Sequence, residues 1–181
     1  MYADERVVPL DDPDSNHKAV LDTLTGAGAP LEGATTVPID PSSTSAAQCA
    51  ERYEAELRRI TGSAAPAVPV LDLVLLGMGP DGHTASLFPG HALLSEAAAA
   101  VAAIEDSPKP PPRRVTLTLP VLRAARASAF VCTGGSKAEA FASVHATLKG
   151  GASDPDSLPS ARVPDATWFL DAPAAGSTLA V

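Results

Sequence analysis

The sequence predicts an α/β fold in which a mainly parallel sheet is flanked by helices. Three observations lead to this prediction. Short apolar runs alternate with segments of helical periodicity along the chain. Residues 70–76, VLDLVLL, are nearly continuous apolar, as expected for a strand covered on both faces. With 181 residues, 45% hydrophobic and 19% charged, the chain is long enough for one domain with a substantial core.

Five elements are expected in the first half of the chain, and the clearest is a helix over residues 43–61. Its apolar residues recur at spacings of four and three, charged residues cover the other side, and Gly62 is a suitable stop. In order, the five are a strand fragment at 1–8, a helix capped by Ser15 or Asn16 and running to about Leu24, a weak extended piece at 36–39, the 43–61 helix and strand 70–76.

The second half continues the alternation of strands and helices, and no internal repeat interrupts it. The segment SPKPPP, residues 107–112, is expected to be an extended linker. The expected elements are an alanine-rich helix running into a strand over 93–104, a strand at 114–119, a short helix from Pro120, a buried strand at 129–133, a helix opened by residues 134–137 and running through Leu148, and a last strand at 167–171.

Composition excludes several classes of function. A net charge of −8 disfavours nucleic acid or an anionic membrane surface as the main partner. No apolar segment approaches the ~20 residues that span a bilayer, and MYADERVVPL does not resemble a signal peptide. Cys49 and Cys132 have no metal-site spacing, and no histidine pairs with acids at such spacing. We therefore expect a cytoplasmic protein with two structural thiols and no metal.

The segment GMGPDGHTAS, residues 77–86, follows the strand predicted at 70–76. Glycines at 77, 79 and 82 allow positive φ and close backbone approach, and their amides suit an anion or a developing oxyanion. Asp81 is placed to orient a neighbouring group, and His83 suits proton transfer near neutral pH. The residues alone leave two interpretations open, an active-site loop and a capped turn with a surface histidine.

Two further segments carry candidate functional residues. Residues 134–137, GGSK, offer amides at a helix start together with the Lys137 cation, which suits phosphate; an ordinary strand-to-helix turn is the alternative. Asp4, Glu5 and Arg6 form a charged cluster at the end of the first strand. A carboxylate and a guanidinium there suit a substrate hydroxyl and phosphate, and a solvated ion pair is the alternative.

Taken in order, five segments resemble the 6-phosphogluconolactonases of the pentose phosphate pathway, in the glucosamine/galactosamine-6-phosphate isomerase superfamily. The match at residues 76–90 is highly specific, and the resemblance covers essentially the whole chain. The segments are DERVVPLDDPDSN (4–16), LGMGPDGHTASLFPG (76–90), RVTLTLPVL (114–122), SKAEA (136–140) and TWFLD (167–171). The resemblance implies a Rossmann-like domain that hydrolyses 6-phospho-D-glucono-1,5-lactone to 6-phospho-D-gluconate without an organic cofactor.

The resemblance also implies a role for each matched residue. A lactone is an activated ester, so water and one base suffice, and amides near the tetrahedral oxyanion would stabilise it. The implied catalytic residues are His83, as the general base that activates water, with Asp81 beside it and Asp4; the implied substrate-binding residues are Arg6, Gly79, Gly82, Lys137 and, as a weaker phosphate candidate, Arg114.

The chain departs from this family at its N-terminus. Family members carry there an opening strand and a Gly-Gly-Ser phosphate loop, so we expect residues 1–181 to form a single domain truncated relative to the family. Two other functions remain open. One is a catalytically weak fragment that only binds sugar phosphate or a partner. The other is an amino-sugar-phosphate isomerase or deaminase, whose loop also carries Gly-Asp-Gly-His; the HTASLFP that begins at His83 favours the lactonase.

Overall fold

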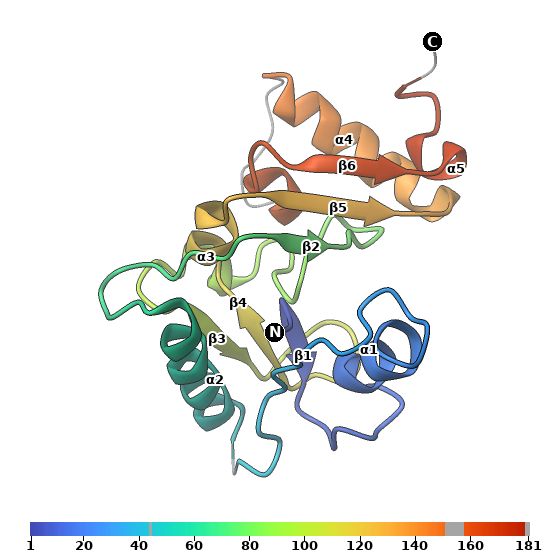
Figure 1. The fold of residues 1–181 in the computed structure, drawn as a ribbon. Helices are drawn as coiled ribbons and strands as arrows, with labels where there is room; N and C mark the ends of the chain where they lie inside the picture. Colours follow the sequence, from blue (N-terminus) through green and yellow to red (C-terminus); the bar gives the residue numbers. More distant parts are fainter. Residues whose placement is uncertain (44, 151–157, 180–181) are drawn as a thin grey trace.

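Two three-stranded sheets form the centre of the molecule in the computed structural model, which describes residues 1–43, 45–150 and 158–179 (Figure 1). The parallel sheet has the order β2 (Val74–Leu76), β5 (Ser128–Cys132), β6 (Thr167–Leu170). The antiparallel sheet has the order β1 (Asp4–Arg6), β4 (Arg114–Leu117), β3 (Val101–Ile104). The expected α/β fold with a parallel sheet is confirmed, and the separate antiparallel sheet is an addition to it.

The connections explain why the sheets differ in direction. β3 and β4 are joined by residues 105–113, which contain no helix, and such a short link permits only antiparallel pairing. β2 and β5 are separated by more than fifty residues that include a helix, as a parallel crossover requires.

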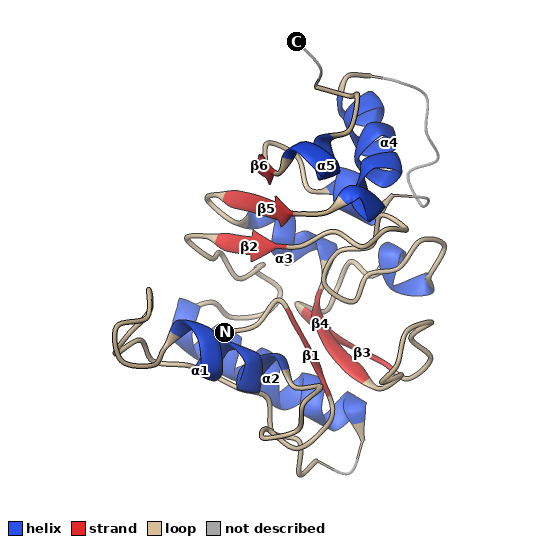
Figure 2. Ribbon diagram, turned by 90° about the vertical axis from the view of Figure 1, so that its right-hand side faces the viewer, coloured by secondary structure: helices blue, strands red, loops and turns tan. Residues whose placement is uncertain are grey.

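Helices lie on one side of the parallel sheet and beside the antiparallel one, as the two views together show (Figures 1 and 2). α3 and α4 share the covered side of the parallel sheet, and α2 packs against β3 and β4. The helices are α1 (Asn16–Leu24), α2 (Ala46–Thr61), α3 (Leu119–Ala124), α4 (Ala138–Leu148) and α5 (Ala172–Ala175), with 3-10 turns at Ala92–Ser95, Gly135–Lys137 and Pro159–Arg162.

An aromatic stack fills the covered side of the parallel sheet. Phe130 of β5 and Trp168 of β6 are register partners, and their rings stack with centroids 4.1 Å apart. Phe141 of α4 packs on Trp168 at 5.4 Å. These contacts hold α4, and with it the turn before α4, at a defined place over the sheet.

The opposite face of the parallel sheet is apolar and exposed. Leu75 of β2, Val131 of β5 and Phe169 of β6 are 64%, 54% and 57% exposed. Strand 70–76 was expected to be covered on both faces; this is wrong, because β2 is an edge strand whose outer face meets no helix of the described chain. Only residues 74–76 of that run find a strand partner.

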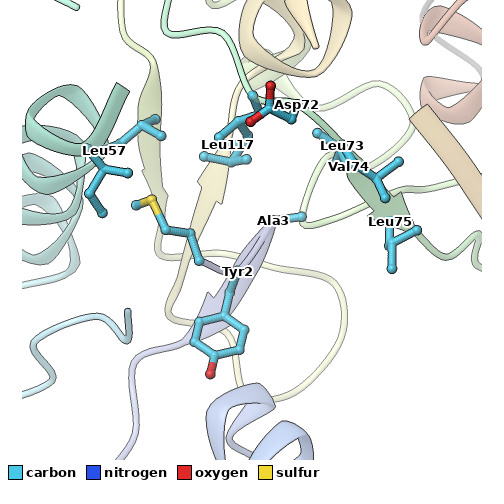
Figure 3. A pocket seen from close by; sticks show the side chains of 11 residues that line it. Tyr2, Ala3, Leu57, Asp72, Leu73, Val74, Leu75 and Leu117 are labelled. Atoms are coloured by element: carbon cyan, nitrogen blue, oxygen red, sulfur yellow. The ribbon is translucent and has the colours of Figure 1, made fainter. Parts of the chain in front are cut away.

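An apolar cavity of about 510 Å³ lies beside the free edge of β2, next to the N-terminus. In Figure 3, Leu73 and Leu75 lie on one side of it and Leu57 and Leu117 on the other. Asp72 is the one charged side chain among its lining residues. The groups with which enzymes move protons or bind phosphate are therefore not gathered in this cavity.

The alanine-rich segment 93–104 forms less helix than expected. A 3-10 turn covers residues 92–95, and the chain then extends into β3. Glu54 of α2 accepts bonds from the backbone amides of Ala100 and Val101, and β4 pairs with the rest. Tertiary hydrogen bonds thus override the helix propensity of alanine. The extended piece at 36–39 pairs with no strand, although Ile39 is buried in the core.

Candidate functional site

A polar cavity of about 350 Å³ lies where the segments that follow β2 and β5 meet β1 and the beginning of β4. Six of the eight residues expected from the sequence line it: Asp4, Arg6, Gly79, His83, Arg114 and Lys137. Asp81 contacts it through His83, and Gly82 lies outside the lining. The fold therefore brings together residues from segments more than a hundred positions apart, at the carboxyl ends of two parallel strands.

The loop after β2 is a tight turn that its glycines make possible. The Gly79 amide donates to the carbonyl of His83 at 2.8 Å, and the Gly82 amide donates to the carbonyl of Gly79 at 3.0 Å. A Cβ on Gly79 would lie 2.0 Å from Nδ1 of His83, and Gly82 has a φ of +82°. Glycine is required at both positions, at the first for space and at the second for conformation.

These same hydrogen bonds change the expectation for the two glycines. Both amides were expected to contact substrate, but each already donates to a carbonyl within the turn. A Cβ on Gly82 would meet Leu158, so this glycine faces a packed side chain. The structure supports a different task for Gly79 and Gly82, which is to shape the turn that presents His83.

His83 and Asp81 form a hydrogen-bonded pair within this turn. Nδ1 of His83 lies 2.5 Å from Oδ1 of Asp81, and the imidazole packs against the Phe88 ring at 4.7 Å. Burial lowers the pKa of His83, and the Asp81 carboxylate raises it but does not restore the ordinary value. For Asp81, burial raises the pKa, while the His83 bond and nearby cations outweigh this and lower it.

Together these shifts define the protonation state of the pair. Near neutral pH, Asp81 is ionised and His83 is a neutral imidazole. An ionised carboxylate only accepts, so the proton of His83 is on Nδ1. The other ring nitrogen, Nε2, then carries a lone pair and has no partner among the described residues. Such a pair can remove a proton from water.

Strand alternation separates the members of the charged cluster 4–6. Asp4 and Arg6 face the cavity, while Glu5 points to the opposite side and is buried. The Asp4 carboxylate accepts from Ser86 Oγ at 2.7 Å and from Asn16 Nδ2 at 3.3 Å. Asp4 is thus held in one orientation at the cavity wall.

Arg6 and Lys137 are the cations with spare hydrogen-bond donors. One Arg6 nitrogen donates to the carbonyl of Asp14 at 2.6 Å, but its buried Nε has no partner among the residues with described placement. The Lys137 ammonium makes no hydrogen bond or ion pair with the residues the structure describes. A buried unpaired donor costs about 1–3 kcal/mol. The side chains of Arg6 and Lys137 both line the cavity, so a phosphate bound there would meet two positive charges that suit its acceptor oxygens.

Arg114 differs from Arg6, because the protein already occupies four of its five N–H donors. Nε donates to the carbonyl of Pro111 at 2.9 Å, and Nη2 donates to those of Lys109 at 2.8 Å and Pro110 at 3.1 Å. Nη1 lies 3.4 Å from Ser86 Oγ. Burial lowers the pKa of this guanidinium. These contacts assign Arg114 to holding the segment before β4, and its role as a phosphate ligand stays a prediction.

Three polar residues of the site were not among those expected from the sequence: Lys109, Ser86 and Asn16, the last of which lines the cavity and donates to Asp4. Lys109 places Nζ 3.3 Å from Asp81 and 3.2 Å from Nδ1 of His83, although its segment was expected to be only a linker. Ser86 is fully buried and bonded to Asp4, 82 residues away. For Lys109 the one available signal in the sequence was a lysine set among prolines directly before a strand. The contacts of Lys109 with His83 and of Ser86 with Asp4 join distant segments, so local sequence does not predict them.

The two cysteines, Cys49 and Cys132, are buried and unpaired, and burial raises the pKa of each thiol. Among the residues with described placement, no cluster of three or more histidine, cysteine or acidic side chains could hold a metal ion. None of the helices in that same part of the chain is long and apolar enough to cross a membrane.

Comparison with known proteins identifies the family. The family described as glucosamine-6-phosphate isomerases/6-phosphogluconolactonase matches residues 1–170. A 6-phosphogluconolactonase of Rattus norvegicus is 46% identical over 96% of this chain, and one of Homo sapiens is 43% identical. Among solved structures, a 6-phosphogluconolactonase from Trypanosoma cruzi superposes with a TM-score of 0.76 at 30% identity, over all of this chain and 72% of its own.

The relatives are longer than this chain. It spans 65% of the rat protein and 66% of the human one, and 74% of a 6-phosphogluconolactonase from Leishmania guyanensis that superposes with a TM-score of 0.78 at 29% identity. Since the family match nevertheless extends over residues 1–170, the chain belongs to the glucosamine-6-phosphate isomerase/6-phosphogluconolactonase family.

Proposed function

We propose that the chain hydrolyses 6-phospho-D-glucono-1,5-lactone to 6-phospho-D-gluconate, a step of the oxidative pentose phosphate pathway, with His83 as general base. The observation that carries the proposal is the 2.5 Å contact between Asp81 and His83 at a cavity that also contains Arg6 and Lys137. A base and two anion-binding cations in one cavity fit a phosphorylated ester that is opened by water.

The proton-transfer step follows from the state of the pair. Nε2 of His83 takes a proton from water as the water oxygen attacks the lactone carbonyl. The tetrahedral intermediate then collapses, the bond from the carbonyl carbon to the ring oxygen breaks, and the imidazolium returns its proton to that oxygen. The Asp81 carboxylate stabilises the imidazolium between these steps. The reaction consumes one water and needs no organic cofactor.

Substrate placement is assigned to the cations and to Asp4. The guanidinium of Arg6 and the ammonium of Lys137 would bind the phosphate, because both side chains line the cavity and carry positive charge. The Asp4 carboxylate, held by Ser86, would accept a hydrogen bond from a sugar hydroxyl. Both contacts would hold the lactone carbonyl near His83.

The test is hydrolysis of the lactone by the purified chain, with the spontaneous rate subtracted, beside a His83→Asn variant. We expect the variant to lose about 10²- to 10⁴-fold in kcat, the usual contribution of a general base. His145→Asn, on α4 and outside the cavity lining, is the matched control and should keep its activity. Near-normal turnover in a folded His83→Asn variant would remove His83 from this role.

A second candidate is a fragment that binds the sugar phosphate without hydrolysing it. It is favoured by the exposed apolar face of the parallel sheet, formed by Leu75, Val131 and Phe169. Calorimetric binding of 6-phosphogluconate by a chain that shows no hydrolysis would support it.

The amino-sugar alternative is supported only by similarity of fold. A solved glucosamine-6-phosphate deaminase, 22% identical with a TM-score of 0.66, shares the fold. Release of ammonia from glucosamine 6-phosphate would revive it.

The compartment belongs to the same proposal. We propose that the protein acts in the cytoplasm. A relative from Oryza sativa subsp. indica carries the name chloroplastic, so the compartment varies among relatives. Fractionation of cells that express the full gene would test this.

A further inference from the structure

Lys109 contacts both members of the proposed catalytic pair. Its ammonium lies 3.3 Å from the Asp81 carboxylate and 3.2 Å from Nδ1 of His83. Because Nδ1 carries the proton that it shares with Asp81, it cannot also accept from Lys109. The ammonium therefore donates to Asp81 and stands as a like charge beside any imidazolium that forms at His83.

The backbone of Lys109 is held firmly enough to place this charge. Its carbonyl accepts from the buried Arg114 at 2.8 Å and from Ser107 Oγ at 2.9 Å, and its amide donates to Ser107 Oγ at 3.2 Å. Arg114 belongs to β4, so the lysine is fixed relative to the sheet. The side chain itself remains 37% exposed and lines the cavity.

We propose that Lys109 is a positioning residue of this site, which holds the Asp81 carboxylate against Nδ1 of His83 and keeps Nε2 unprotonated as the nitrogen presented to the cavity. The placement of Lys109 beside Asp81 and His83 does not depend on the proposed function. Its effect on the reaction rate rests on the proposed function of His83 as a base.

Other charged groups also face His83 and set the background for Lys109. Asp81 is on the same turn, Asp4 and Arg6 are on β1, and Arg114 and Lys137 approach from β4 and from the turn before α4. Burial lowers the pKa of His83 most, Asp81 raises it, Lys109 lowers it and Asp4 raises it. Removal of the Lys109 charge should therefore raise the affinity of His83 for a proton.

The direct test is the titration of His83 by NMR in the substrate-free chain, assigned by comparison with His83→Asn. In Lys109→Met we expect the pKa of His83 to rise by roughly 0.5–1 unit, because one like charge is removed. Lys109→Arg keeps the charge and should stay close to the parent. Lys149→Met, an exposed lysine at the end of α4, is the control and should leave the titration unchanged.

The kinetic arm measures kcat/KM against pH in the same variants. If the proposed function holds, the acid limb of Lys109→Met moves upward by the same amount as the NMR pKa. An unchanged pKa of His83 in folded Lys109→Met overturns the inference, as does an equal shift in Lys109→Arg. A raised KM with an unchanged pKa would overturn it too, since Lys109 would then be a substrate contact. A parent chain without hydrolysis would contradict the proposed function while the titration still decides the role of Lys109.

Discussion

Hydrogen-bond partners decide what each charged residue of the cavity can do. Arg6 and Arg114 have the same side chain and face the same cavity. Three backbone carbonyls and the Ser86 hydroxyl take four of the five N–H donors of Arg114, whereas the buried Nε of Arg6 has no partner among the described residues. A guanidinium whose donors are satisfied positions the protein, and one with a spare donor is available to an anion.

The pH dependence of the proposed reaction follows from the two partners of His83. The base must be neutral, so kcat/KM rises with pH through the pKa of His83 and is level above it. Asp81 raises that pKa. In Asp81→Asn we therefore expect the acid limb to move to lower pH, in the opposite direction from Lys109→Met, and the plateau to fall about 10-fold or more because the imidazole is a weaker, poorly oriented base.

A second histidine–aspartate contact supplies the control for this measurement. Nε2 of His91 lies 3.1 Å from Asp106, outside the cavity lining. Asp106→Asn should leave the profile unchanged. An unshifted acid limb in Asp81→Asn would mean that His83 does not set it.

At the scale of elements, the three residues of β1 both line the cavity and cap a helix. Its alternation directs Asp4 and Arg6 to the cavity and Glu5 to the N-terminus of α1. There the Glu5 carboxylate accepts from the amides of Asn16 and His17, both at 2.7 Å, and from Ser15 Oγ at 3.1 Å. A charge-assisted cap of this kind ties α1 to the strand that carries the site.

Loss of this cap should be measurable as a loss of stability. Glu5→Ala leaves two helix amides and the Ser15 hydroxyl without their acceptor, so we expect the free energy of unfolding to fall by about 2–4 kcal/mol. Urea denaturation followed by circular dichroism measures it. Glu51→Ala, on the exposed side of α2, is the control and should change stability by less than about 0.5 kcal/mol. A similar small change in Glu5→Ala would show that water replaces the carboxylate.

At the scale of the whole molecule, an apolar face and an apolar cavity meet at the free edge of β2. Leu75 belongs to both, since it projects from the exposed face and lines the cavity shown in Figure 3. Alternate residues of β5 and β6, such as Val131 and Phe169, extend the face across the sheet. Contiguous apolar surface of this kind binds hydrophobic probes and promotes association.

The exposed apolar face should bind a hydrophobic dye in the isolated chain. We expect the chain to enhance the fluorescence of such a dye, and the double variant Leu75→Thr, Val131→Thr to reduce that signal several-fold. Leu21→Thr, which changes an exposed leucine on α1, is the control and should leave it unchanged. The pKa of His83 should be the same in all three chains, because the open face and the polar cavity share no lining residue. Equal dye fluorescence in the parent and the double variant would contradict an open apolar face.

Local features of the sequence predicted well wherever the interaction itself is local. The helix expected over 43–61 is observed over Ala46–Thr61, because the apolar stripe and the Gly62 terminator act within a few residues. The Asp81–His83 contact lies within one turn and could be anticipated for the same reason. Whether both faces of strand 70–76 are covered could not be anticipated, because this depends on which distant segments pack against the strand.

By itself the sequence determined the alternation of strands and helices, the family and the polar residues that follow β2 and β5, since periodicity, glycine turns and motif order are carried by neighbouring positions. Only the tertiary structure decided which cations remain available to bind an anion and that Lys109 approaches His83. It also decided that the amides of Gly79 and Gly82 donate to carbonyls within the turn. The reason is physical: a donor or a charge acts on whatever lies within a few ångströms, and the fold alone sets those neighbours.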